Sequence, residues 1–421
     1  MGAFVIRGCE IYLGGAFVPA ELEVRGGVVT ALGGGIVPGE GASVYNFKNC
    51  IVVPGLADVH VHLREPGFSY KETVASGTRA AARSGYSALC AMPNLSPVPE
   101  DAATLAQELE IIRRDAVIDV LPYGAITRGQ RGEQLADMSA MAPYVCGFSD
   151  DGRGVQSREL MRAAMLEAKR LGRPIAAHCE DNSLLRGGYI HEGEYAKAHG
   201  HRGICSESEW GPIARDIELL RETGCAYHVC HISTAESAAL IRSAKREGLD
   251  ITCETAPHYL LLSDSDLQED GRFKMNPPLR SERDRLALIE ALRDGTIDIL
   301  ATDHAPHSRE EKSRGLAGSA FGITGLETAF PLLWTGLVEP GIITRERLVE
   351  LMSTAPARRF GIESGIEPGG PATFAVFETE TTYRIDPERF ASKGRATPFA
   401  GREVRGRCVL NVVRGREVWR A

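Results

Sequence analysis

Residues 51–67 read IVVPGLADVHVHLREPG. The first part of this stretch is an almost continuous apolar run, which is typical of a β-strand buried on both faces. Two histidines, His60 and His62, stand two residues apart, and side chains at that spacing point to the same side of a strand. Arg64 follows two residues later. A buried strand that ends in two imidazoles on one side indicates a binding function for its end.

Seven further runs of the same kind follow, with helical patterns between them. The eight runs cover residues 56–63, 86–92, 117–124, 144–150, 173–179, 225–232, 249–256 and 297–304. Eight strand–helix repeats over roughly 250 residues predict an α/β fold of the (β/α)8, or TIM-barrel, class. A doubly wound open sheet is the alternative, but it does not need eight repeats, and no GxGxxG motif follows the first strand.

Two of the helical patterns can be placed closely. Residues 157–173 carry apolar side chains near a period of 3.6 residues, at Leu160, Ala163, Ala164, Leu166 and Leu171. Gly172 is positioned to end this helix. Residues 283–295 repeat the amphipathic pattern and also end on a glycine.

The two ends of the chain differ from its middle, because they read as short strands joined by glycine turns. We expect residues 1–52 and 366–421 to be the N- and C-terminal parts of one small composite β domain. Residues 53–365 would then form the (β/α)8 barrel. The pairing of the two terminal pieces is the simplest arrangement, although no pattern in the sequence records a contact between them.

The composition excludes several classes of protein. The net charge is −8, from 48 Lys and Arg against 56 Asp and Glu, which argues against a nucleic-acid binder. The ten cysteines are scattered without a CxxC pair, which favours free thiols in a reducing cytoplasm over disulfides. No signal peptide is recognisable, and no stretch approaches the ~18 apolar residues of a membrane span. We therefore expect a soluble cytoplasmic protein.

Metal-binding residue types gather where the predicted strands end, which is the working rim of such a barrel. These residues are His60, His62, Asp150, Asp151, His178, His231 and Asp303. Any one of them has an ordinary explanation, such as a hydrogen-bonded histidine or an aspartate that caps a helix. Four histidines and two acids, counting one of the adjacent Asp150 and Asp151 together with Asp303, are costly at one rim of a core that disfavours polar atoms. Imidazole with carboxylate predicts Zn²⁺ or a similar first-row ion with open positions for water.

Nine motifs in order along the chain carry a family resemblance. They are DVHVHLREPG (58–67), MPN (92–94), SDDG (149–152), AHCED (177–181), CHIS (230–233), TAPHYL (255–260), MNPPLR (275–280), ATDHAPH (301–307) and FGITGLET (321–328). Together they resemble the dihydroorotases of the amidohydrolase superfamily over nearly the whole chain. The resemblance implies reversible cyclisation of N-carbamoyl-L-aspartate to L-dihydroorotate and water, in de novo pyrimidine (UMP) biosynthesis.

The resemblance also implies roles for the residues at the rim. His60, His62 and Asp303 would hold one Zn²⁺, and His178 and His231 a second, with Asp151 spanning both. Asp150 would be structural. A hydroxide shared by the two metals would attack the ring carbonyl, with Asp303 as general base and then general acid.

By the same resemblance, the substrate contacts are His62, Arg64, Asn94, Asn276, His307, Phe321 and Gly322. Arg64 would pair with the free carboxylate through two parallel hydrogen bonds, a geometry that lysine cannot reproduce. The backbone of Phe321 and Gly322 would face the ring amide. Segment 307–322 is polar and rich in glycine, which is the composition of either a mobile loop over the site or a plain surface loop.

Two other functions stay open. Hydantoinases and allantoinases, and some dihydroorotases, carry a lysine at the end of strand four that becomes carboxylated and bridges two metals. YVCGFSDDG (144–152) has no lysine, and the branch of dihydroorotases that the chain resembles uses an aspartate as the bridge. Some relatives have lost metal ligands and serve as structural partners of aspartate carbamoyltransferase, but every ligand position is filled here. The metal's identity and occupancy, a homodimer, and association of an active enzyme with that transferase are left undecided.

Overall fold

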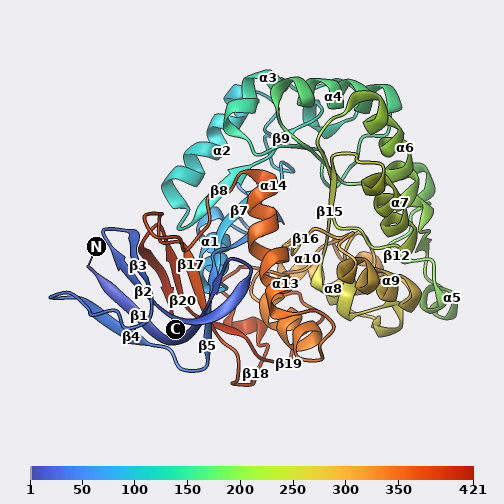
Figure 1. Ribbon diagram of the computed structural model, residues 1–421. Helices are drawn as coiled ribbons and strands as arrows, with labels where there is room; N and C mark the ends of the chain where they lie inside the picture. Colours follow the sequence, from blue (N-terminus) through green and yellow to red (C-terminus); the bar gives the residue numbers. More distant parts are fainter. Residues whose placement is uncertain (1) are drawn as a thin grey trace.

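The structure is a computed structural model that describes residues 2–421, with a barrel of parallel strands beside a separate sheet (Figure 1). Each of the eight predicted runs contains a strand. The barrel strands are β6 (Leu56–Val61), β7 (Tyr86–Ala91), β8 (Asp119–Pro122), β9 (Gly124–Ala125), β10 (Phe148–Ser149), β11 (Ile175–Ala177), β14 (Tyr227–Val229), β15 (Ile251–Thr255) and β16 (Ile299–Leu300). They pair in parallel in the orders β6-β7-β8 and β9-β10-β11-β14-β15-β16.

Two features join these strands into one ring. The third run is divided at Tyr123, so that β8 pairs with β7 and β9 pairs with β10. At the other seam, a parallel bridge links Val61 to His304, and the His62 N–H donates to the His304 carbonyl at 2.9 Å. The predicted (β/α)8 barrel is therefore confirmed. Its strands are shorter than the predicted runs because the tilt and stagger of a barrel limit how far each strand pairs with both neighbours.

Helices surround the ring of strands (Figure 1). The longer ones are α1 (Val74–Arg83), α2 (Ala102–Asp115), α4 (Arg158–Leu171), α6 (Glu207–Thr223), α7 (Ala235–Arg246) and α9 (Glu282–Arg293). The shorter ones are α3 (Met138–Met141), α5 (Glu194–His199), α8 (Pro257–Leu261), α10 (Arg309–Lys312), α11 (Gly315–Gly318), α12 (Ala329–Leu333), α13 (Arg345–Val349) and α14 (Ala355–Phe360). The helices predicted in 157–173 and 283–295 are α4 and α9.

The sequence pattern assigned part of the apolar face of α4 wrongly. Gly172, at φ 66°, ends the helix as predicted, and Ser157 caps its start. The buried residues are Met161, Ala164, Met165 and Ala168, whereas Leu166 is 42 % exposed. The positions 161, 164, 165 and 168 form one helical stripe, and the flexible methionines fill it in place of leucine.

The two ends of the chain form one sheet beside the barrel, so the predicted composite β domain is confirmed. Its strands are β1 (Phe4–Leu13), β2 (Ala16–Arg25), β3 (Val28–Gly33), β4 (Ser43–Asn46), β5 (Cys50–Pro54), β17 (Phe374–Glu378), β20 (Arg407–Val413) and β21 (Arg416–Arg420). Their order is β21-β20-β17-β5-β1-β2-β3, with β4 also on β1. Two small ladders, β12 (Ile190–His191) with β13 (Gly203–Ile204) and β18 (Tyr383–Arg384) with β19 (Glu403–Val404), lie outside it. The boundaries at 52/53 and 365/366 stay a prediction.

The antiparallel pair β5–β17 is the seam between the two ends of the chain. Val52 lies opposite Val376, and both belong to the apolar cluster of the terminal sheet. Their neighbours Ile51, Val53 and Phe377 belong to the large core cluster of the barrel. Because successive residues of a strand alternate between its faces, one pair of strands serves two cores.

The part of the chain that the structure describes also bears on the predictions from composition. All ten cysteines are free thiols, and all except Cys205 are buried. Among residues 2–421, no helix has both the length and the apolar character needed to cross a bilayer.

A buried polar contact ties the terminal sheet to the barrel. Asn411 of β20 is fully buried, and its Nδ2 donates to the carbonyl oxygens of Ala82 and Tyr86, each at 2.8 Å. These carbonyls flank the turn between α1 and β7.

We expect Asn411→Leu to lower the free energy of unfolding by about 1–3 kcal/mol, because it leaves buried carbonyl oxygens without their donor. Urea unfolding followed by circular dichroism measures the change. The matched control is Asn182→Leu, at an exposed position, which should stay within about 0.5 kcal/mol of the wild type. Equal effects of the two substitutions would contradict the prediction.

Candidate metal centre and substrate pocket

The six predicted metal ligands lie at the carboxyl ends of barrel strands. His60 is in β6 and His62 directly follows it; Asp151, His178, His231 and Asp303 follow β10, β11, β14 and β16 within one to three residues. All six side chains are buried, at 6 % exposure or less. Buried polar groups in this number need partners, either in one another or in a bound ion.

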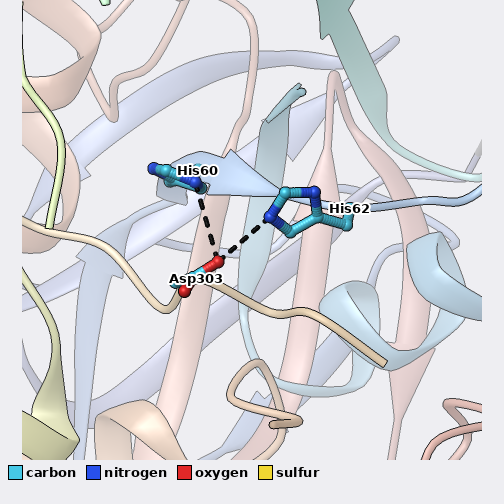
Figure 2. Close-up of side chains that lie close together, drawn as sticks. All are labelled: His60, His62 and Asp303. Atoms are coloured by element: carbon cyan, nitrogen blue, oxygen red, sulfur yellow. Dashed lines mark hydrogen bonds and ion pairs between the residues drawn. The ribbon is translucent and has the colours of Figure 1, made fainter. Parts of the chain in front are cut away.

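Asp303 faces the two histidines of the first strand (Figure 2). Its Oδ1 lies 3.1 Å from His62 Nε2 and 3.6 Å from His60 Nε2. The three side chains each offer a ligand atom, and these atoms all lie within 4.8 Å of one another. One metal ion can therefore reach all three.

Asp151 lies at the centre of the remaining histidines. Its Oδ1 is 3.3 Å from His60 Nε2, 3.4 Å from His178 Nδ1 and 3.5 Å from His231 Nε2. His60, Asp151 and His231 form a second group of atoms within 4.8 Å, so the geometry assigns His60 to both groups. The bridging role proposed for Asp151 agrees with this central place.

Asp150, which precedes Asp151 in the sequence, makes structural hydrogen bonds. Its carboxylate accepts hydrogen bonds from the backbone N–H groups of Ile126, at 2.9 Å, and Thr127, at 3.1 Å. It also accepts one from the Thr127 hydroxyl. Burial raises the pKa of Asp150 to about 6 in spite of these donors. These contacts tie β10 to the loop after β9 and leave Asp151 to face the histidines.

The residues present fit a bound divalent cation. His60 Nε2, Asp151 Oδ1 and His178 Nε2 are buried without a hydrogen-bond partner. Within residues 2–421, the ion-pair partners of Asp151 and Asp303 are all histidines. Burial opposes a charge on His60, but the carboxylates of Asp151 and Glu254 outweigh it and raise its pKa well above the ordinary value. The site thus attracts positive charge, and imidazole with carboxylate is a donor set that suits zinc.

Two residues fix the orientation of the first-strand histidines. Glu254 of β15 lies 2.6 Å from His60 Nδ1, and Asn94 Oδ1 lies 2.8 Å from His62 Nδ1. Each contact occupies Nδ1 and directs Nε2 to the site, as outer partners of metal-binding histidines do. Glu254 also accepts from His228 Nε2 at 3.1 Å. The sequence reasoning missed Glu254, although an acid within a buried strand was a usable signal.

A cavity of about 220 Å³ brings the predicted residues together. Its lining includes all seven predicted substrate contacts: His62, Arg64, Asn94, Asn276, His307, Phe321 and Gly322. Asp151, His178, His231 and Asp303 line it as well. Five of the six candidate ligands and all the candidate substrate contacts therefore share one small pocket, with His60 outside its lining.

Arg64 contributes to this pocket a positive charge that has no carboxylate partner among the described residues. Its side chain is buried, with Nε donating to the Pro306 carbonyl at 3.3 Å. Within residues 2–421 it forms no ion pair within 4 Å, and burial lowers its pKa. His307 Nε2 lies 3.4 Å from the guanidinium, and burial lowers the pKa of His307 to about 3, so that histidine is neutral. An anion in the pocket would supply the missing partner of Arg64.

Asn276 is held by a residue that the sequence reasoning missed. Its Nδ2 donates to Glu180 Oε1 at 2.9 Å, while Asn276 Oδ1 is buried without a partner. Glu180 Oε2 also lies 3.6 Å from His178 Nε2. Glu180 thus fixes which end of the Asn276 amide remains free to accept a hydrogen bond.

The Phe321 carbonyl and the Gly322 N–H, predicted to face the substrate, already have hydrogen-bond partners within the protein. His307 Nε2 lies 2.7 Å from the Phe321 carbonyl, and the Gly322 N–H donates to the Lys274 carbonyl at 3.1 Å. Gly322 has φ +127°, and a Cβ there would lie 2.6 Å from the Ala305 carbonyl oxygen, so the position requires glycine. Segment 307–322 contains α10 and α11, and its mobility stays a prediction.

The comparisons with known proteins agree with the resemblance seen in the motifs. A family model described as dihydro-orotase-like matches residues 49–237. The dihydroorotase of Bacillus caldolyticus is 46 % identical and aligns over 100 % of this chain and 99 % of its own length. That of Fusobacterium nucleatum subsp. nucleatum is 46 % identical over 98 % of this chain and 97 % of its own length.

Solved structures share the fold at lower identity. The L-hydantoinase (dihydropyrimidinase) of Arthrobacter aurescens has a TM-score of 0.88 and 25 % identity, and covers 100 % of this chain and 96 % of its own. The dihydropyrimidinase of Brevibacillus agri NCHU1002 has a TM-score of 0.86 and 23 % identity, covers 99 % and 95 % of the two chains, and shows the fold alone. The identity over the full length decides between these groups, and the chain belongs to the dihydroorotase family.

Proposed function

We propose that the chain is a zinc-dependent dihydroorotase, which interconverts N-carbamoyl-L-aspartate and L-dihydroorotate in pyrimidine biosynthesis. The observation that carries this proposal is the shared pocket: an unpaired, buried arginine lies beside a group of imidazoles and carboxylates. L-dihydroorotate offers a free carboxylate for the arginine and a cyclic amide for a metal held by the imidazoles and carboxylates. The near 46 % identity to curated dihydroorotases over the whole chain supports the same reaction.

Six side chains would hold the metal. His60, His62 and Asp303 would bind one zinc ion and His178 and His231 a second, with Asp151 between them. Zinc supplies Lewis-acid chemistry when bound, lowering the pKa of a water molecule and polarising the amide carbonyl. Glu254 and Asn94 keep the first two imidazoles turned toward the ion.

Asp303 would carry the proton. In ring opening, the attacking water forms a C–O bond to the ring carbonyl carbon and gives its proton to the Asp303 carboxylate. The C–N bond then breaks, and Asp303 returns that proton to the leaving nitrogen. In ring closure the carbamoyl nitrogen forms the C–N bond and water leaves. Burial raises the pKa of Asp303, but the hydrogen bond with His62 and the neighbouring imidazoles outweigh it and lower that pKa, which favours the ionised form that a base requires.

Arg64 would bind the substrate's free carboxylate, assisted by Asn94 and His307. Asn276 Oδ1, the free end of an amide held by Glu180, would accept an N–H of the ring. Phe321 would close the mouth, since its side chain is 37 % exposed at the cavity. A cytoplasmic location, a homodimer and association with aspartate carbamoyltransferase stay predictions beside this one.

The function is tested by assay of the purified chain in both directions. We expect interconversion of N-carbamoyl-L-aspartate and L-dihydroorotate that is lost on chelation and restored by Zn²⁺, since the ligands are proposed to act through the metal. A side-by-side assay with hydantoin and allantoin is the control. A folded, metal-replete sample that opens either of those rings faster than dihydroorotate would contradict the proposal.

The adjacent aspartates give a matched pair of variants. Asp151→Asn should reduce bound zinc below two per chain and lower kcat/KM by more than about 100-fold, because even outer partners of metal ligands cost 10–100-fold. Asp150→Asn should retain zinc but lose about 1–3 kcal/mol of unfolding free energy through weaker hydrogen bonds. Metal analysis with urea unfolding separates the two. Zinc loss in Asp150→Asn alone would reverse the assignment.

Arg64→Lys should lower kcat/KM by about 10–100-fold, because an ammonium ion cannot make the paired hydrogen bonds of a guanidinium. Zinc content should not change. Lysine faces the same backbone strain as arginine at φ +62°, so the comparison isolates the head group. Arg153→Lys, at an exposed position, is the control. If Arg64→Lys retained full kcat/KM, the carboxylate would have to bind elsewhere.

A further inference from the structure

Lys312, the last residue of α10, is a buried lysine whose three hydrogen-bond partners are all backbone carbonyls. Lys312 is only 7 % exposed. The Nζ donates to the carbonyl oxygens of Lys274 at 2.9 Å, Ala320 at 2.7 Å and Gly322 at 2.7 Å. A protonated amine has three N–H bonds, so these three acceptors use its full capacity.

The three carbonyls belong to two segments that meet at the substrate pocket. Ala320 and Gly322 flank Phe321, and Lys274 stands two residues before Asn276. Phe321, Gly322 and Asn276 all line the 220 Å³ cavity. The Gly322 N–H donates to the same Lys274 carbonyl at 3.1 Å. Lys312 therefore sits where the two walls of the pocket are joined.

A charge at this place is costly to the fold. Within residues 2–421, Lys312 forms no ion pair, and Asp270 and Glu311 act on it only at longer range. Burial, together with the nearby Lys274, lowers the pKa of Lys312 to about 7. Burying a charge without a carboxylate partner is costly, and an apolar side chain of similar size would avoid that cost, but it would leave the three carbonyls without a donor. The neutral amine has only two N–H bonds and would leave one carbonyl unfilled.

We propose that Lys312 is a positioning residue for the substrate: its ammonium group fixes the turn Ala320–Gly322 against segment Lys274–Asn276, and so sets the shape of the pocket's outer wall. Lys274 adds to the same wall. Its Nζ donates to the Ala317 carbonyl at 2.9 Å and lies 4.6 Å from the centre of the Phe321 ring. Lys312 touches neither the candidate metal ligands nor the reacting atoms, and acts through the backbone.

The test compares Lys312→Met, Lys312→Gln and the wild type as full-length, zinc-loaded enzymes. Lys312→Met keeps the length of the side chain without its donors, and Lys312→Gln keeps two N–H bonds. Arg309→Met is the control, because Arg309 is an exposed cation of the same helix α10, paired with Glu388. It removes the same unit of charge outside the pocket.

We expect the KM for L-dihydroorotate to rise about tenfold in Lys312→Met and less in Lys312→Gln, with kcat within about threefold and zinc content unchanged. Hydrogen–deuterium exchange of residues 319–323 should be at least about tenfold faster in Lys312→Met. Arg309→Met should match the wild type in every measurement. A loss of kcat at constant KM, or an unchanged KM and exchange rate in the folded variant, would overturn the inference.

The inference rests on the proposed function for its kinetic readout only. If the wild type lacks dihydroorotase turnover, the proposed function fails, while the exchange rates still decide whether Lys312 holds the turn. If Lys312→Met does not fold, Lys312→Gln carries the test, and a KM within twofold of the wild type would then overturn the inference.

Discussion

Closure of the barrel between its first and last strands is the constraint on which the rest of the structure depends. The His62 N–H donates to the carbonyl of His304, and the Val61–His304 bridge extends the same contact. This seam places His62 beside Asp303, 241 residues away in the chain. Without it, the two histidines at the end of β6 would have no carboxylate from the segment after β16. The chemistry of the site thus depends on closure of the barrel between its first and last strands.

The residues at the site are held in conformations that an isolated chain avoids. Arg64, His231 and Asp303 have positive φ values of 62°, 33° and 47°, a region in which non-glycine residues are uncommon. Each such conformation costs of order 1–3 kcal/mol and persists only where the surroundings enforce it.

A hydrogen-bonded network provides that enforcement next to His231. The buried carboxylate of Glu209 accepts from the backbone N–H groups of Ser233, at 2.9 Å, and Thr234, at 3.1 Å. The backbone directly after His231 is therefore fixed by this carboxylate. Rigid support of this kind keeps the imidazole in place when its neighbours change charge or bind an ion.

Much of the fold was readable because the signals are local and periodic. Each apolar run contains a barrel strand, and Gly172 ends α4 as its place in the sequence predicts. The dihydroorotase resemblance rested on short motifs and is confirmed by relatives that align over the whole chain. The burial of Met161 and Met165 in place of Leu166 was not readable, because it depends on which stripe meets the sheet.

The sequence predicted the residue types that meet at the site, but not the residues that hold them in position. Histidines and aspartates at strand ends are conspicuous, and the structure brings them together; their roles as ligands stay proposals. Glu180 and Lys312 were missed because their partners, the amide of Asn276 and three backbone carbonyls, come from distant segments. A lysine in a polar loop gives no sign that it is buried. Only three-dimensional contacts distinguish it from its exposed neighbours.

The seam between β5 and β17 has a consequence for the order in which this protein can form during synthesis. Residues 374–378 leave the ribosome long after residues 50–54, so the edge of β5 that β17 covers has no partner while the whole barrel is being made. An uncovered strand edge is a template for wrong pairing. The nascent chain therefore depends on residues 374–378 to cover a strand edge made by residues 50–54, and a chain truncated before residue 374 would leave that edge without its partner.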